Sequence, residues 1–174
     1  VLDTLNDNTS GAINAGSINT LTGNAADLNT VYSANGSGIT GLGNEAVTLS
    51  DSTLAASVLN TLNDNTSGVI NAGSINTLSG SYADLNTAYT ANANGSISGL
   101  GNEAVTLNDT TLAVSVLNDL DGHTSGTINA GSINTLTGAA ADLNTAYTSA
   151  GISALNNEAI TLSDTTLAVS VLND

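Results

Sequence analysis

The chain has 174 residues with fifteen Asp and Glu, no Lys or Arg and one His, so its net charge at pH 7 is −15. Without cationic side chains it cannot neutralise phosphates or anionic headgroups, which argues against nucleic-acid binding and against attachment to a membrane surface. It has no Cys, which excludes a disulfide framework. It also has no apolar run of the length that a membrane span needs.

The sequence consists of near-copies of one string. The copies cover 1–57, 58–115 and 116–170, and 171–174 begins a fourth. Self-similarity at a fixed period predicts a stack of units that bury their apolar faces against their neighbours. The chain opens with VLDT and closes with VLND, the same phase of the repeat. We therefore expect it to be a window of a longer array.

Each copy contains two predicted coils, and the first, over 45–68, begins with a strand. The alternating run AVTL is typical of a strand with Val47 and Leu49 pointing inward and Thr48 outward. The following Ser50 and Asp51 are candidates to cap a helix, because short oxygen side chains accept hydrogen bonds from the free amides of a first turn.

A helix is expected next. Residues at helical spacing share one apolar face: Leu54, Val58, Leu59 and Leu62. The polar segment NDNTSG ends this helix, with Gly68 available for a left-handed turn.

The second coil, 69–102, is predicted to repeat this order. A short strand is expected at 69–72, with Thr48 and Asn71 at matched outward positions on successive strands. Ile75 and Leu78 should point inward.

A second helix follows in this coil. We expect Ser79 to cap it, and its apolar face consists of Tyr82, Leu85 and Tyr89. The next segment, ANANGSISGLGN at 91–102, varies in length among the copies. We expect it to be an exposed loop on the rim, where insertions are tolerated.

Strands that alternate with helices and run in the same direction are expected to pair in parallel, with the helices as crossovers. The expected fold is thus an α/β repeat solenoid with two coils per repeat of about 57 residues. A β-solenoid with short helices is the alternative. The run VTLSDSTL resembles the heart of a leucine-rich repeat, with Ser52 in place of the characteristic Asn.

The alternation of GLGNEAVTLSD-TLA-SVLN with INAGSINTLTG-AADLNTAY resembles the tandem arrays of very large secreted or cell-surface proteins of aquatic bacteria, including cyanobacteria. The resemblance implies an extracellular structural role without catalytic residues. The likeness covers the whole chain and rests on low-complexity repeats.

Acidic and amide side chains recur at a fixed phase of the repeat. They are Asn44, Glu45 and Asp51, then Asn102, Glu103 and Asp109, then Asn157, Glu158 and Asp164. One interpretation is capping and solvation of strand ends. The alternative is a row of Ca²⁺ sites built from these oxygen donors, since Ca²⁺ prefers carboxylate and carbonyl oxygens.

No catalytic residue and no cofactor is expected. The single His, His123, occurs in one copy and has no second His or Cys with which to hold a metal. Asp119, Asp121 and Gly122 before it are expected in the C-terminal turn of a helix. Aromatic residues, which line most glycosidase clefts, are 2% of the chain.

Five Asn residues lie in Asn-x-Ser/Thr sequons: Asn8, Asn35, Asn65, Asn94 and Asn108. Glycan attachment is therefore a further hypothesis. The sequence as a whole predicts a structural extracellular repeat protein that forms a stalk or filament by stacking, with itself as partner. A calcium-dependent adhesin or surface-layer module is the alternative.

Overall fold

The computed structural model of the protein describes residues 1–168. The expected beginning of a fourth repeat, 171–174, lies outside the described residues. The chain divides into two compact units. Unit 1 consists of Val1–Asn76 and Thr87–Leu100, and unit 2 of Thr77–Asn86 and the chain from Gly101 onward.

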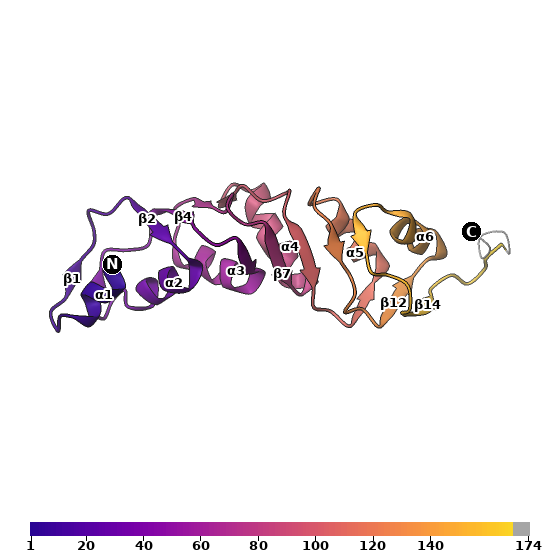
Figure 1. The fold of residues 1–174 in the computed structure, drawn as a ribbon, viewed down its shortest axis with the longest axis horizontal. Coiled ribbons are helices and arrows are strands. Elements are labelled where there is room, and N and C mark those ends of the chain that lie inside the picture. Colours follow the sequence, from indigo (N-terminus) through magenta and orange to yellow (C-terminus); the bar gives the residue numbers. More distant parts are fainter. Residues whose placement is uncertain (169–174) are drawn as a thin grey trace. The chain divides into compact units, whose positions relative to one another are not determined.

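Short helices and short strands alternate along both units (Figure 1). The helices are α1 (Leu2–Asp7), α2 (Ala25–Ser33), α3 (Ala56–Asn65), α4 (Tyr82–Ala93), α5 (Val114–Asp121) and α6 (Ala140–Thr148). The strands are β1 (Ile13–Asn14), β2 (Thr20–Gly23), β3 (Ile39–Thr40), β4 (Ala46–Leu49), β5 (Thr53–Ala55), β6 (Ile70–Asn71), β7 (Thr77–Gly80), β8 (Ile97–Ser98), β9 (Ala104–Leu107), β10 (Thr111–Ala113), β11 (Ile128–Asn129), β12 (Thr135–Gly138), β13 (Ile152–Ser153) and β14 (Ala159–Leu162).

Strands of successive coils pair in parallel, which confirms the α/β solenoid with helical crossovers. In unit 1, β2, β4, β6 and β8 form one ladder, in which Leu21, Val47, Ile70 and Ile97 lie side by side. In unit 2, β7, β9, β11 and β13 form the equivalent ladder, in which Leu78, Val105, Ile128 and Ile152 lie side by side.

Consecutive strands of the chain alternate between neighbouring ladders. Ile97 comes 50 residues after Val47 and is still in the same ladder. Val105, the counterpart of Val47 one copy later, is in the next one. Before Ile97 the chain has already contributed β7 to the second ladder, and it returns from β8 to that ladder through Gly99 and Gly101, whose φ angles of 88° and 121° are in the left-handed range that glycine tolerates.

The core is aliphatic and lies between the strands and the helices. The predicted alternation of β4 is confirmed, because Val47 and Leu49 are buried and Thr48 is exposed. Ile75 and Leu78 are buried as well. Thr48 and Asn71 are also paired in register, as expected.

The segment 91–102 is more than an exposed loop, so that prediction was partly wrong. Its tip at Asn94 and Gly95 is exposed. However, Ile97 is fully buried and lies in β8, paired with Ile70 of the preceding coil. A two-residue strand with one apolar position is too short to leave a period-2 pattern.

The start of the first helix in the coil was also predicted wrongly. Leu54 is buried in strand β5, and α3 begins at Ala56. The buried face of α3 is formed by Ala56, Leu59 and Leu62, whereas Val58 is half-buried. In unit 2 the equivalent strand β10 pairs with β12. A strand neighbour from another coil therefore overrides the helical spacing of Leu54.

Two cap assignments change as a consequence. Ser50 and Asp51 lie ahead of β5 and do not cap α3, whose N-cap is Ala55. Ser79 lies in β7, and the cap of α4 is Ser81. The Ser81 hydroxyl accepts a hydrogen bond from the Asp84 amide at 3.2 Å and donates one to its carboxylate at 2.8 Å.

Gly68 does not adopt a left-handed conformation, contrary to expectation. A Cβ at this position would instead overlap the backbone carbonyl of Glu45, and at the equivalent Gly126 it would overlap that of Glu103. Glycine is required here because two backbones approach closely. The turn after α5 is as predicted, with Gly122 as the C-cap.

Candidate functional site

Each recurring glutamate stands directly before one of the four-residue strands β4, β9 and β14, at the end of the loop that leads into that strand. Glu45 is 0% exposed and Glu103 is 1% exposed. The Glu45 carboxylate accepts hydrogen bonds from the Gly43 amide at 2.9 and 3.1 Å and from the Tyr32 hydroxyl at 3.0 Å. Glu103 accepts from the amides of Gly101 at 2.8 Å and Asn102 at 3.1 Å. Hydrogen-bond donors thus offset the cost of burying these carboxyl groups.

The third copy has the same arrangement in a more exposed form. Glu158 accepts hydrogen bonds from the Tyr147 hydroxyl and from the amides of Asn156 and Asn157 at 3.1 and 3.2 Å. Burial alone raises the pKa of Glu158, but these hydrogen bonds outweigh it, so the pKa lies below its ordinary value.

The tyrosines that face the glutamates resist ionisation. Burial raises the pKa of Tyr32 to about 12, with a smaller opposing effect from the Thr66 hydroxyl and a further increase from the hydrogen bond and charge of Glu45. Burial, together with Glu158, raises the pKa of Tyr147 to about 12 as well. Both phenols therefore remain donors to their carboxylates across the neutral range.

The recurring aspartates cap helices of the preceding coil. The Asp51 carboxylate accepts a hydrogen bond from the Ala25 amide, at the first residue of α2, at 2.8 Å. Asp164 does the same for Ala140 of α6 at 2.8 Å, and Asp109 for Tyr82 of α4 at 2.7 Å. The negative charge at each helix N-terminus satisfies a free amide and complements the helix dipole. For the aspartates the capping interpretation is therefore correct, although the capped helix belongs to another coil, and it is wrong for the glutamates, which bind loop amides.

The predicted calcium ligands are consequently used by different parts of the fold. The Glu of each copy binds amides of its own loop, and the Asp binds a helix of the preceding coil. The amide candidates Asn44, Asn102 and Asn157 are exposed in the loops. Among residues 1–168, no group of three or more His, Cys, Asp or Glu side chains could hold a metal ion.

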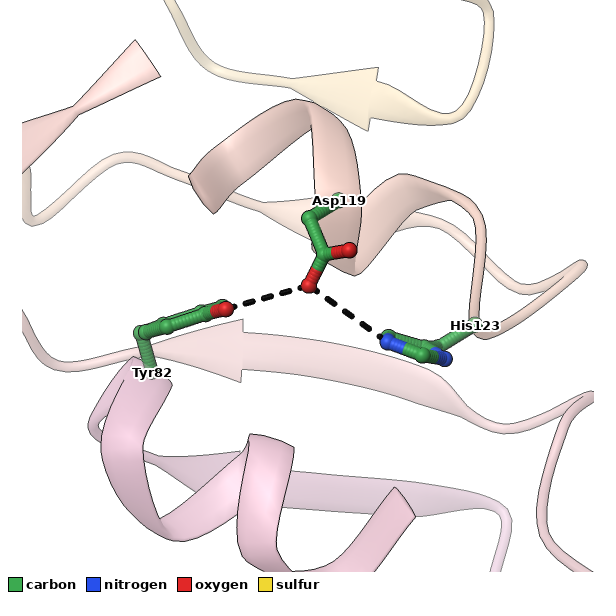
Figure 2. A network of polar contacts seen from close by, with 3 residues as sticks. All are labelled: Tyr82, Asp119 and His123. Atoms are coloured by element: carbon green, nitrogen blue, oxygen red, sulfur yellow. Dashed lines mark hydrogen bonds and ion pairs between the residues drawn. The ribbon is translucent and has the colours of Figure 1, made fainter. Parts of the chain in front are cut away.

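One cluster departs from the repeat, and it lies in unit 2 (Figure 2). The Tyr82 hydroxyl donates a hydrogen bond to Asp119 Oδ2 at 3.0 Å, and His123 Nε2 lies 3.5 Å from the same oxygen. Burial, followed by the hydrogen bond and charge of Asp119, raises the pKa of Tyr82. The cluster connects the first residue of α4 with the end of α5.

All three of its members replace a different residue of the repeat. The counterparts of Tyr82 are Ala25 and Ala140, and the counterparts of Asp119 and His123 in the preceding copy are Thr61 and Asn65. Sequence reasoning considered His123 alone and assigned Tyr82 to a core face. An alignment of the three copies would have revealed the three positions, but not their proximity. The cluster joins α4 to the end of α5, and in the preceding copy Asn65, the counterpart of His123, donates to Asn29 Oδ1 of α2 at 3.1 Å.

The five sequon asparagines are all exposed: Asn8, Asn35, Asn65, Asn94 and Asn108. Two of them use the amide nitrogen that a glycan would modify. Asn35 Nδ2 donates to the Leu42 carbonyl at 3.0 Å and Asn65 Nδ2 donates to Asn29 Oδ1 at 3.1 Å. Attachment at these two sites would cost a hydrogen bond, so the geometry favours the other three.

A hollow with an apolar floor lies at the first coil, between α1, β2 and α2. Its apolar lining consists of Val1, Leu2, Leu5, Ile18, Leu21, Leu28 and Val31. The acidic side chains Asp3 and Asp27 also line this hollow.

The chain matches no protein-family model, and no characterised protein and no solved structure shows significant similarity to it. In the described part of the chain, every helix is too short or too polar to cross a bilayer.

Proposed function

We propose that the chain is a structural element of an extracellular or cell-surface repeat protein, in which coils stack into a stalk or filament. The observation that carries this proposal is that each coil completes the one before it. Asp51 caps α2 of the preceding coil, and the Ser74 hydroxyl donates to the carbonyls of Leu49 and Asp51 at 2.9 Å each. The recurring polar groups thus serve contacts between coils.

The charge supports the same proposal. Fifteen acidic side chains without a Lys or Arg repel one another, which keeps an array soluble and opposes side-by-side aggregation. Salt screens this repulsion, so the composition suits a saline exterior. The exposed sequons Asn8, Asn94 and Asn108 are the sites at which glycans would coat such an array.

The stacking is tested by the stability of arrays of different length. Chains with one, two and three fused copies of the 174-residue sequence, joined in phase by following residue 170 with residue 1, would be unfolded by urea. Stacked repeats gain a neighbour interaction with each copy, so the midpoint should rise with length. Equal midpoints for all lengths would show that the copies fold independently and would refute the structural proposal.

The location is tested with an antibody against the chain. Intact source cells should be labelled as strongly as permeabilised ones. Labelling that requires permeabilisation would contradict an extracellular or cell-surface role.

A further inference from the structure

The tetrapeptide Ala-Asn-Gly-Ser occurs twice in the sequence, at 34–37 and at 93–96. Both copies lie in unit 1, where the chain leaves α2 and α4, and both asparagines are exposed. An asparagine before a glycine can react with its own backbone, because glycine has no side chain to hinder the approach of its nitrogen to the asparagine amide carbon. Since the local sequence is identical, a difference in reactivity between Asn35 and Asn94 has to come from the fold.

The fold holds the side chain of Asn35 in place. Its Nδ2 donates to the Leu42 carbonyl at 3.0 Å, and its Oδ1 accepts from the Leu42 amide at 3.4 Å. The Gly36 amide, which would have to attack the side chain, donates to the Ile39 carbonyl at 2.7 Å. These contacts oppose the rearrangement that would bring the Gly36 nitrogen to the Asn35 side chain.

In the second copy a different asparagine makes the contact to the leucine. The segment 91–102 is one residue longer than its counterpart 34–44. Asn92 follows an alanine near the end of the helix, as Asn35 does, and its Oδ1 accepts from the amide of Leu100 at 3.2 Å. Leu100 is the counterpart of Leu42. Asn92 thus takes the place of Asn35, and the Asn-Gly dipeptide of this copy lies beyond it at the tip of the turn.

Asn94 is therefore held less firmly than Asn35. Within residues 1–168, no group accepts a hydrogen bond from Asn94 Nδ2, and Asn94 Oδ1 accepts one from the Ser96 amide at 3.1 Å. This amide donor polarises the side-chain carbonyl and stabilises the negative charge that develops on Oδ1 under attack. The Gly95 amide donates to the Asn92 carbonyl at 3.2 Å, a longer contact than that of Gly36.

From this difference we propose that Asn94 is a site of spontaneous deamidation, whereas the fold protects Asn35. The Gly95 backbone nitrogen loses its proton and attacks Cγ of Asn94. The bond between Cγ and Nδ2 breaks, and ammonia leaves with the proton from Gly95, so the product is a cyclic succinimide. Water opens the ring at one of its two carbonyls and gives aspartate or isoaspartate. The amide and one water molecule are thus converted to a carboxylate and an ammonium ion.

Deamidation and glycosylation of Asn94 exclude each other. A glycan is attached to Nδ2, the nitrogen that leaves in the reaction. A chain that deamidates first gains a negative charge at the tip and can no longer carry a glycan there. The sequons at Asn8 and Asn108 are not followed by glycine and keep their amides. This consequence rests on the proposed surface function, whereas the reaction itself does not.

Mass spectrometry of the unglycosylated 174-residue chain tests the site. The folded chain is kept at mildly alkaline pH in heavy-oxygen water and is then digested in ordinary water with chymotrypsin. Cleavage after Tyr and Leu releases Asn35 and Asn94 on separate peptides. Asn94 should gain heavy oxygen at least about tenfold faster than Asn35, because fewer hydrogen bonds have to break. Equal rates, or a faster reaction at Asn35, would overturn the inference.

The unfolded chain is the matched control, because the two sites share one tetrapeptide. In guanidinium chloride their rates should agree within about threefold, since the local sequence then sets them. If the difference of the folded chain persists there, the fold is not its cause and the inference fails. It also fails if folded Asn94 stays unlabelled during the time in which the unfolded chain reacts completely.

A graft tests whether the longer segment is the cause. Replacing 34–44 with the sequence of 91–102 gives the first copy the same turn, and its Asn-Gly dipeptide should then react within about threefold of Asn94. Circular dichroism establishes that the graft is folded. A folded graft that reacts as slowly as Asn35 would refute the inference. In a separate control, Asn94→Gln lengthens the side chain, so labelling at this position should stop while the rate at Asn35 stays unchanged.

Discussion

The carboxylate of Asp109 accepts a hydrogen bond from the backbone amide of Tyr82 at 2.7 Å, across 27 positions of the sequence. Asp51 and Asp164 hold the same relation to Ala25 and Ala140. An aspartate at one phase of the repeat thus couples α2, α4 and α6 each to the coil that follows it. The stability of the array depends on these contacts between coils as well as on apolar burial.

Replacing Asp109 with Ala should lower the free energy of unfolding by about 1 kcal/mol, because the Tyr82 amide loses its side-chain acceptor while the Ser81 cap of α4 remains. Asp109→Asn keeps a side-chain oxygen that can accept from the Tyr82 amide, so it should restore much of the loss. Urea denaturation of the two variants measures the difference. A loss in Asp109→Asn equal to that in Asp109→Ala would show that the cap depends on charge and not on the acceptor.

Removal of the Tyr32 hydroxyl should have a larger effect than the same change at Tyr147. Tyr32 donates to Glu45, which is fully buried, and Tyr32→Phe should cost about 1.5–3 kcal/mol, the range for a hydrogen bond to a charged group. Tyr147 and Glu158 lie nearer to solvent, which can replace the lost donor. Equal denaturation midpoints for Tyr32→Phe and Tyr147→Phe would contradict this ranking.

The raised pKa of Tyr32 predicts loss of stability in alkali. Its pKa is 10.0 in the unfolded reference and about 12 in the fold, because burial disfavours the phenolate. A raised pKa gives a contribution that is fully present below pH 10 and is lost as the pH rises from 10 towards 12. Denaturation midpoints measured over this range should fall less steeply for Tyr32→Phe than for wild type. Parallel declines would show that Tyr32 does not titrate as proposed.

A double-mutant cycle tests the contact between Tyr82 and Asp119. We expect Tyr82→Phe and Asp119→Asn to show a coupling energy of about 0.5–1 kcal/mol, since the pair is partly exposed. His123→Asn restores the residue of the preceding copies and should change the stability by less than about 0.5 kcal/mol at neutral pH. High salt screens the charge contribution, so the same cycle in high salt should retain only the part of the coupling energy that comes from the hydrogen bond.

Calcium should raise the melting midpoint no more than magnesium does at equal ionic strength. Both cations screen the fifteen carboxylates, while the recurring Glu and Asp oxygens already accept hydrogen bonds within the fold. Thermal melts in each ion and in chelator provide the measurement. A rise specific to calcium would instead favour the adhesin hypothesis, because a ligand that binds the folded state stabilises it.

The sequence alone determined the features that depend on local pattern. The alternation of AVTL placed Val47 and Leu49 inward, since side chains of a strand point to opposite faces in turn. The repetition of the copies determined that coils stack in parallel, since equivalent segments need equivalent neighbours. Of the acids at fixed phase, the aspartates were correctly interpreted as caps, because a carboxylate can satisfy a free amide where a helix begins.

Only the tertiary structure decided which partners these groups have. Asp51 caps α2 rather than the helix that follows it, Leu54 belongs to a strand, and Ile97 is in the core. In each case the neighbour comes from another coil, some 24 to 27 residues away in the equivalent pairs. A local pattern records which side chains are apolar or can accept a hydrogen bond. The register within each ladder decides which backbone lies opposite, and that register depends on the length of a whole coil.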